Sequence, residues 1–106
     1  MNPEFDPVLN REIFLALWKI HILHHAAEGE VVGRWMLGEL HEHGYDVSPG
    51  TLYPILKRME RHGWLAGRSE RNASPRAPRR YSITTSGREI LRRIRLQLAE
   101  LKAELG

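Results

Sequence analysis

Residues 48–65, Ser-Pro-Gly-Thr-Leu-Tyr-Pro-Ile-Leu-Lys-Arg-Met-Glu-Arg-His-Gly-Trp-Leu, have the chemistry of one capped helix. Ser48 can accept a backbone N–H at the N-cap, Pro49 suits the first helical position, and Gly63 suits a left-handed helix stop. Val47 and Leu52 fit a hydrophobic staple across the helix start. These signals predict a helix between the serine and the glycine.

The predicted helix has two different faces. At about 100° per residue, one face is apolar: it holds Leu52, Ile55, Leu56 and Met59. The other face mixes a small residue, an aromatic hydroxyl and cations, which suits the phosphates and base edges of a DNA major groove. An ordinary solvated helix has a similar composition, so the helix alone leaves both interpretations open. The residues assigned to DNA contact here are Ser48, Gly50, Thr51, Tyr53, Pro54, Lys57, Arg58 and Arg61.

The net charge of +3 conceals a segmental distribution. Residues 1–56 contain three Lys or Arg against eight acids, whereas residues 57–95 contain twelve Lys or Arg against three acids. The first segment is therefore at −5 and the second at +9, with residues 96–106 contributing the remaining −1. A segment as basic as 57–95 favours polyanion binding through counterion release.

Length and composition favour one domain over residues 1–106. A chain of 106 residues with 42% hydrophobic residues has room for a modest core but not for a separate catalytic domain. It has no cysteine, no long apolar run and no charged signal-peptide start, so we expect a soluble, cytoplasmic protein with no membrane partner. No nucleophile elbow or phosphate-binding glycine loop is present, which argues against an enzyme.

Two helices are predicted before residue 48. The first runs from Asp6 and Pro7 to about Ala27, and it is apolar on two sides. One stripe consists of Leu9, Ile13, Ala16, Ile20, Leu23 and Ala27, and the other of Phe14, Trp18 and Ile22. We assign the second stripe to a dimer interface, although a C-terminal helix folding back could also cover it. The second helix spans residues 33–43 with Gly44 as its stop, so it forms a helix-turn-helix with the basic helix.

A β-hairpin is predicted after the basic helix. Residues 64–70 and 79–84 are the two strands, and the proline-containing segment 71–78 is their loop. Four arginines lie in or beside this loop: Arg71, Arg76, Arg79 and Arg80. We assign them to DNA contact as a wing, in preference to a solvated loop.

The last predicted helix begins at Thr84 or Ser86, with Ser86 and Glu89 as a capping box. Its apolar residues recur at spacings of 3 and 4, as in a coiled-coil seam: they are Leu91, Ile94, Leu98, Leu101 and Leu105. The seam covers only about two heptads, and we assign it to dimerisation rather than to packing within one subunit. The expected fold is mainly α with a small β-hairpin, a winged helix-turn-helix over residues 7–84 followed by a dimerisation helix over 85–106.

This order of elements resembles the PadR family of transcriptional regulators over about residues 12–105. The resemblance rests on Gly-Thr-Leu-Tyr-Pro at 50–54, Tyr-Ser-Ile-Thr at 81–84 and Gly87. It implies a winged helix-turn-helix homodimer, usually a repressor, held together by its first and last helices, with DNA contact at Tyr53, Lys57 and the wing arginines. The single short C-terminal helix resembles the compact branch of the family. The chain departs from the family pattern at 33–35, where Gly-Arg-Trp replaces the usual Gly-Tyr.

Tryptophans and histidines suggest two further sites. Some relatives bind planar aromatic compounds at the dimer interface, and Trp18 and Trp35 could stack on such an effector, although core packing is the favoured role for both.

The histidines form two groups, His21, His24 and His25, then His41 and His43. His21 and His25 have the spacing of a metal pair, but solvated or hydrogen-bonded histidines are favoured, and we expect no metal and no cofactor.

The sequence therefore predicts a DNA-binding transcriptional regulator, specific for a double-stranded sequence and acting as a homodimeric repressor. The alternative is a winged-helix module that binds proteins or RNA and does not select a duplex sequence. A steep salt dependence with duplex DNA separates the two.

Overall fold

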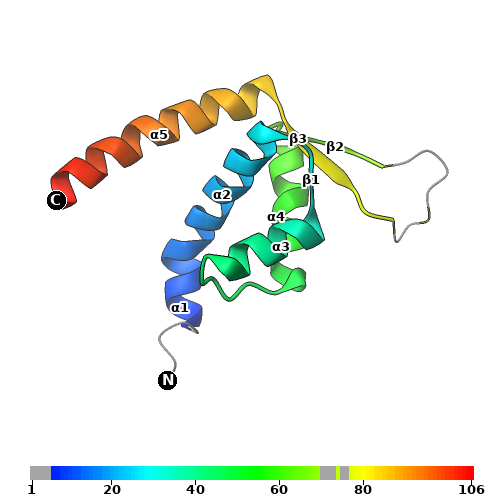
Figure 1. The fold of residues 1–106 in the computed structure, drawn as a ribbon, viewed down its shortest axis with the longest axis horizontal. Helices are drawn as coiled ribbons and strands as arrows, with labels where there is room; N and C mark the ends of the chain where they lie inside the picture. The colour runs from blue at the N-terminus through cyan, green and yellow to red at the C-terminus, as the bar shows by residue number, and fades with distance from the viewer. Residues whose placement is uncertain (1–5, 70–73, 75–76) are drawn as a thin grey trace.

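The computed structural model describes residues 6–69, 74 and 77–106. Its helical elements are α1 (Pro7–Leu9), the π-helical turn η1 (Asn10–Phe14), α2 (Leu15–Glu28), α3 (Gly33–Glu42), α4 (Pro49–Arg61) and α5 (Thr85–Leu105). Its strands are β1 (Val31–Val32), β2 (Leu65–Arg68) and β3 (Arg80–Ile83). Figure 1 shows α2, α3 and α4 packed together, with the β2–β3 hairpin extending to one side and α5 to the other. The fold is mainly helical with a small antiparallel sheet, as the sequence predicts.

The first predicted helix is confirmed as the continuous series α1, η1 and α2. The Asp6 carboxylate caps its start by accepting hydrogen bonds from the backbone N–H groups of Val8 and Leu9 at 3.0 and 3.1 Å. The π-helical turn at Asn10–Phe14 was not predicted. Such a turn inserts a residue into the helical repeat and rotates the next turns of the helix, so a regular 3.6-residue pattern does not hold across it.

The core lies on the side of α2 that carries Trp18 and Ile22. These side chains are 3% and 0% exposed and share one buried cluster with residues of α3 and α4. The prediction that this stripe lacks a partner within the chain is therefore wrong for both residues. Phe14 is half-buried against the ring of Tyr45, with centroids 5.3 Å apart. The other stripe is divided, because Ile13 is 54% exposed whereas Leu23 is 1% exposed and belongs to the core.

The helix-turn-helix is confirmed, with one difference at the start of α4. Gly44 ends α3 and Gly63 follows α4, both in the left-handed region, with φ of 90° and 82°. The side chain of Ser48 does not cap α4 within the described residues, because its hydroxyl donates to Thr51 Oγ1 at 3.2 Å. The backbone carbonyl of Ser48 instead accepts from Thr51 and Leu52.

The sheet has three antiparallel strands in the order β1-β3-β2. Val31 of β1 pairs with Tyr81, and Leu65 of β2 pairs with Ile83. The two predicted strands are confirmed but shorter than predicted. The two-residue strand β1 was not predicted, because so short a strand carries no alternation to recognise.

The start of α5 is fixed by Thr84 and Gly87. The Thr84 hydroxyl oxygen accepts from Gly87 N–H at 2.9 Å, so Thr84 is the cap and the predicted Ser86–Glu89 box does not form. A Cβ on Gly87 would collide with the backbone carbonyl of Trp64, which accounts for glycine at this position. Among the described residues, no helix has the length and apolar character needed to cross a membrane.

The seam of α5 is buried at its start and exposed at its end. Leu91 is 4% exposed and Ile94 packs against the core, so these two residues have partners in their own chain. Leu98, Leu101 and Leu105 are 40%, 49% and 77% exposed. Within the described part of the chain, the second half of the predicted seam is therefore left exposed.

Candidate nucleic-acid interface

The two-faced character of α4 is confirmed. Its four apolar residues are at most 1% exposed, which fixes the rotation of the helix about its axis. The opposite face is solvent-accessible, and its exposed residues include all eight that the sequence assigns to DNA contact on this helix. A rigidly seated helix with a basic outer face is the geometry that groove binding requires.

Tyr53 is held against the backbone at the start of α3. Its ring lies so close to Gly33 that a Cβ on that glycine would collide with the ring, while the side chain as a whole stays 44% exposed. Gly33 therefore makes room for Tyr53. The sequence gives no local signal for this pairing, because the two residues lie on different helices.

Arg79 is engaged within the chain. Its guanidinium donates to both carboxylate oxygens of Glu60, at 3.1 and 2.7 Å, to Ser69 Oγ at 3.0 Å and to the Gly67 carbonyl at 3.2 Å. These bonds tie the base of the hairpin to the last turn of α4. The hydrogen bond from Arg79 lowers the pKa of Glu60, so the carboxylate stays charged at neutral pH. Glu60 is a positioning residue that the sequence analysis missed.

Of the other three arginines assigned to the wing, one lies within the described residues and two lie outside them. Arg80 is exposed on β3. Arg71 and Arg76 lie outside the described residues. Arg68, which was not assigned to DNA contact, donates to the carboxylate of Glu30 at 2.7 and 2.8 Å and thereby joins β2 to the segment before β1.

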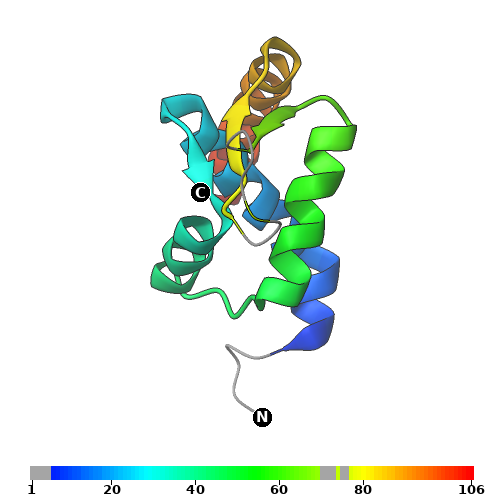
Figure 2. The ribbon, with the colours of Figure 1, turned by 90° about the vertical axis from the view of Figure 1, so that its right-hand side faces the viewer.

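A groove of about 750 Å³ lies between α3, α4 and the hairpin. Its lining includes Arg34, Trp35, Tyr53, Lys57 and Arg79. Figure 2 faces the hairpin and shows α3 and α4 on either side of it. Trp35 is 48% exposed here, so the predicted core packing is wrong for Trp35, whereas it is confirmed for Trp18. Cations and aromatic rings thus line the space between α3, α4 and the hairpin.

The histidines are arranged differently from their two groups in the sequence. His21, His25 and His43 lie together, with one ligand nitrogen of each within 4.8 Å of the others. His41 Nε2 lies 2.7 Å from the Val47 carbonyl. Burial, followed by the neighbouring His43, lowers the pKa of His21, so its ring is neutral at neutral pH.

A helix-turn-helix followed by a β-hairpin that packs beside its second helix defines the winged helix-turn-helix class of DNA-binding proteins. Within this class the chain belongs to the PadR-like family of transcriptional regulators, whose family model matches residues 22–93. The family resemblance drawn from the sequence is therefore confirmed. This family consists of regulators of transcription, which implies regulation through DNA binding rather than catalysis.

Individual relatives agree with this placement. The chain is 48% identical over 95 residues to the transcriptional regulator Rv3488 of Mycobacterium tuberculosis, covering 90% of this chain and 88% of that protein. A PadR-like transcriptional regulator from Bacillus cereus has a similar structure, with a TM-score of 0.76, 26% identity, and coverage of 89% and 92%. A PadR-like transcription factor from Bacteroides fragilis shares the fold, with a TM-score of 0.73, 20% identity, and coverage of 94% and 96%.

Proposed function

We propose that the chain is a sequence-specific repressor that binds double-stranded DNA as a homodimer. The observation that carries this proposal is the seating of α4, which buries every apolar residue of its inner face and presents Tyr53, Lys57 and Arg61 outward. Phosphates and guanine edges are the partners of Lys and Arg in a major groove, and Tyr can donate to phosphate. Acting on chromosomal DNA would place the protein in the cytoplasm.

The outer face of α4 divides into two flanks in this proposal. Tyr53 and Lys57 line the groove beside the wing, whereas Thr51, Pro54 and Arg58 lie on the flank toward α1 and α2. Gly50 and Ser48 stand at the helix start, where a phosphate oxygen can approach the backbone closely. Arg61 extends the basic surface toward the end of the helix.

The wing supplies the remaining DNA contacts. Arg80 is exposed on β3, and the sequence assigns Arg71 and Arg76 to the same role. Arg79 braces the hairpin against α4 through Glu60, so we propose that it orients the wing rather than reaching DNA freely. The winged helix-turn-helix over residues 7–84 then reads the groove, and residues 85–106 join the subunits.

The dimer is proposed from the uncovered half of α5. Leu98, Leu101 and Leu105 form one exposed apolar stripe, and Ile13 is an exposed apolar residue on the first helix. A second copy of the chain would cover both, with Leu91 and Ile94 anchoring α5 to its own core. Two-fold symmetry then spaces two α4 helices for paired half-sites.

Repression would be relieved by a signal that alters the angle between subunits. A small aromatic effector remains the candidate, with Trp18 bordering a pocket of about 530 Å³ between the first helix and α4. The Trp18 Nε1–H is buried and has no hydrogen-bond partner among the described residues, so we propose it as a donor to a ligand oxygen. Such a ligand shifts the equilibrium only if it binds the two arrangements with different affinities.

Fluorescence anisotropy with duplexes selected from random and genomic DNA tests the proposal. We expect selection of a palindrome and a steep salt slope. The Lys57→Ala/Arg61→Ala double variant should lose affinity and flatten the slope by about 3.6, because the dimer loses four phosphate contacts at roughly 0.9 each. Arg95→Ala on α5 is the matched control, because it removes an exposed arginine away from α4. Unchanged binding by the double variant would remove α4 from the DNA-facing role.

Two outcomes separate the remaining alternatives. Flat salt dependence without duplex selection would favour a protein-binding or RNA-binding module. If a palindrome is selected, transcription in vitro from a promoter containing it should fall when the protein is added, and a rise would contradict the repressor assignment.

A further inference from the structure

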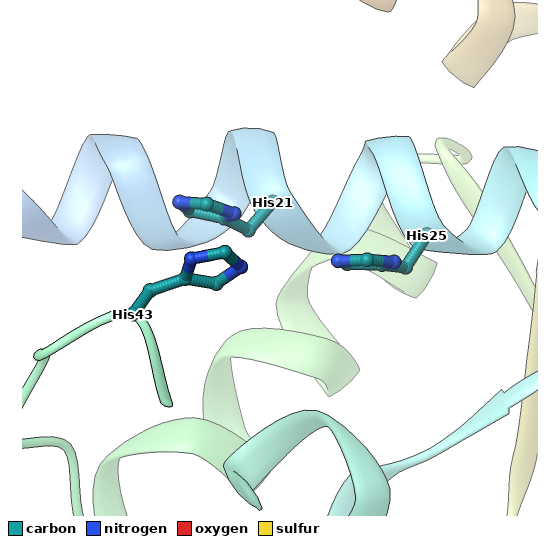
Figure 3. A group of neighbouring side chains, drawn as sticks. All are labelled: His21, His25 and His43. Carbon is teal, nitrogen blue, oxygen red and sulfur yellow. The ribbon is translucent and has the colours of Figure 1, made fainter. Parts of the chain in front are cut away.

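Three histidines that are dispersed in the sequence converge on one side of α2. His21 and His25 lie one turn apart on this helix, and His43 is the residue that caps the C-terminus of α3. One ring nitrogen of each lies within 4.8 Å of the others. Figure 3 shows the His43 ring beneath the His21 ring, with His25 beside them further along α2. We call these residues the histidine cluster.

A carboxylate joins this cluster from α3. Glu39 Oε1 lies 3.4 Å from His25 Nε2 and 3.5 Å from His43 Nε2. The side chains of Glu39 and His25 are only 23% and 15% exposed, so their positions are set by packing more than by solvent. The three imidazoles thus lie together, and the Glu39 carboxylate contacts two of them.

This set of donors matches a transition-metal ion. Zinc binds four ligands drawn from His, Cys and Asp or Glu, and imidazole also suits nickel and copper. Calcium and magnesium require mostly oxygen ligands, which this cluster does not provide among its described residues. The rings of His21 and His43 are stacked with centroids 4.6 Å apart, an arrangement that two protonated imidazoles would oppose.

We propose that His21, His25, His43 and Glu39 bind one divalent transition-metal ion of the zinc class. Ligand nitrogens around tetrahedral zinc are roughly 3.3 Å apart, so the rings must close in by about 1 to 2 Å. His43 is 46% exposed and stands at a helix end, where such a movement meets little resistance.

A second grouping, His24, His25 and Glu28, shares one histidine with the proposed site. His24 and Glu28 are 46% and 65% exposed, and all three residues belong to α2 alone. Among the described contacts, the ion pairs of His24 and Glu28 involve only α2 residues, and His25 alone reaches Glu39 of α3. The proposed site, by contrast, spans α2 and α3.

Binding at this site would clamp α2 to the segment that leads into α4. His43 begins that segment, and Tyr45 within it packs against His21, with ring centroids 5.5 Å apart. An ion that holds His43 therefore restrains the connection between the two helices of the helix-turn-helix. The binding site itself does not depend on the proposed repressor function, and its test uses no DNA.

Cobalt(II) and zinc(II) test the site directly. The full chain, free of any histidine tag and stripped with a chelator, is titrated with cobalt(II) while its visible absorption is recorded, since four-coordinate cobalt(II) absorbs strongly there. We expect saturation at one ion per chain. Zinc at 100-fold excess over its Kd should raise Tm by roughly 10 °C, and magnesium should not.

Three variants assign the ligands. His43→Gln and Glu39→Gln should weaken cobalt(II) binding at least 10-fold, whereas the control His24→Gln should bind as the parent does. Circular dichroism and the metal-free Tm of each variant check that the fold is intact. The proposal is overturned if cobalt(II) gives no visible bands and zinc no shift in Tm, or if His24→Gln abolishes binding while His43→Gln does not.

Discussion

Helices α4 and α5 are both amphipathic, yet the chain covers their apolar faces to very different extents. The inner face of α4 is buried along its whole length, from Leu52 to Met59. The apolar face of α5 is buried at Leu91, half-buried at Ile94 and exposed from Leu98 onward. The same apolar periodicity thus occurs in α4, whose apolar face is fully buried within the chain, and in α5, whose apolar face is half exposed.

The difference shows that a stripe of apolar residues indicates which face of a helix becomes buried. It does not indicate whether the same chain or a second copy buries that face. For α4, the cover comes from α2, α3 and the sheet. For the end of α5, among the described residues, it does not come from the chain itself, and an exposed leucine stripe favours association. Substitutions in the two helices, and in the contacts that position α4, test this difference in burial. They are given in order from the largest expected effect to the smallest.

Shortening one leucine in each helix tests the contrast in burial. Leu56→Ala should lower the free energy of unfolding by about 3 kcal/mol, because it removes fully buried methyl groups and leaves a cavity. Leu105→Ala should cost less than about 0.5 kcal/mol at concentrations where the chain is monomeric. Urea unfolding measures both. Equal losses would mean that the end of α5 is covered by its own chain.

A charge in the exposed stripe tests its role in the proposed dimer. Leu98→Asp should shift the protein from dimer to monomer in sedimentation, since a buried unpaired carboxylate is strongly unfavourable at an apolar interface. Gln97→Glu, one position away on the same helix, is the control and should leave the assembly unchanged. A Leu98→Asp dimer would exclude this stripe from the interface.

Removing the carboxylate at the end of α4 tests the brace between this helix and the wing. Glu60→Gln should lower Tm by about 2 to 4 °C at neutral pH, because Arg79 loses its charged partner. The pKa of folded Glu60 lies below its ordinary value of 4.5, so its contribution is present above that pH and disappears as the pH falls through the lowered pKa. The difference between parent and variant should therefore vanish in acid, and a constant difference would reject the ion pair as its cause.

Adding a methyl group at Gly33 tests how the outer face of α4 is positioned. Gly33→Ala should displace the Tyr53 ring and weaken operator binding by about 3- to 10-fold, with a small effect on Tm because the ring is half-exposed. Tyr53→Ala should lose a similar factor, and the double variant should lose no more than either single variant. Additive losses would show that Gly33 does not act through Tyr53.

Local chemistry predicted most element boundaries. The stops at Gly44 and Gly63, the cap at Thr84 and the two faces of α4 are confirmed, because each depends on residues within a few positions of one another. The Ser48 cap was wrong because its hydroxyl had another neighbour in Thr51. Strand β1 was not predicted because a strand of two residues is too short to show the alternation of apolar and polar residues.

The candidate site was only partly predictable. The exposed residues of α4 follow from its period, but the Gly33–Tyr53 contact and the Glu60–Arg79 pair join separate elements. Trp35 is exposed although tryptophan usually packs in a core. No property of its local sequence distinguishes it from Trp18.

By itself, the sequence determined the order of the elements, the faces of α4 and the segmental positive charge, because these depend on residue type and spacing along one chain. Only the tertiary structure decided which apolar residues of the first helix face inward, that Arg79 is engaged with Glu60, and that His43 joins His21 and His25. Periodicity places residues on a common face. The partner of that face depends on how the helices pack, and packing is settled by contacts among residues far apart in the sequence.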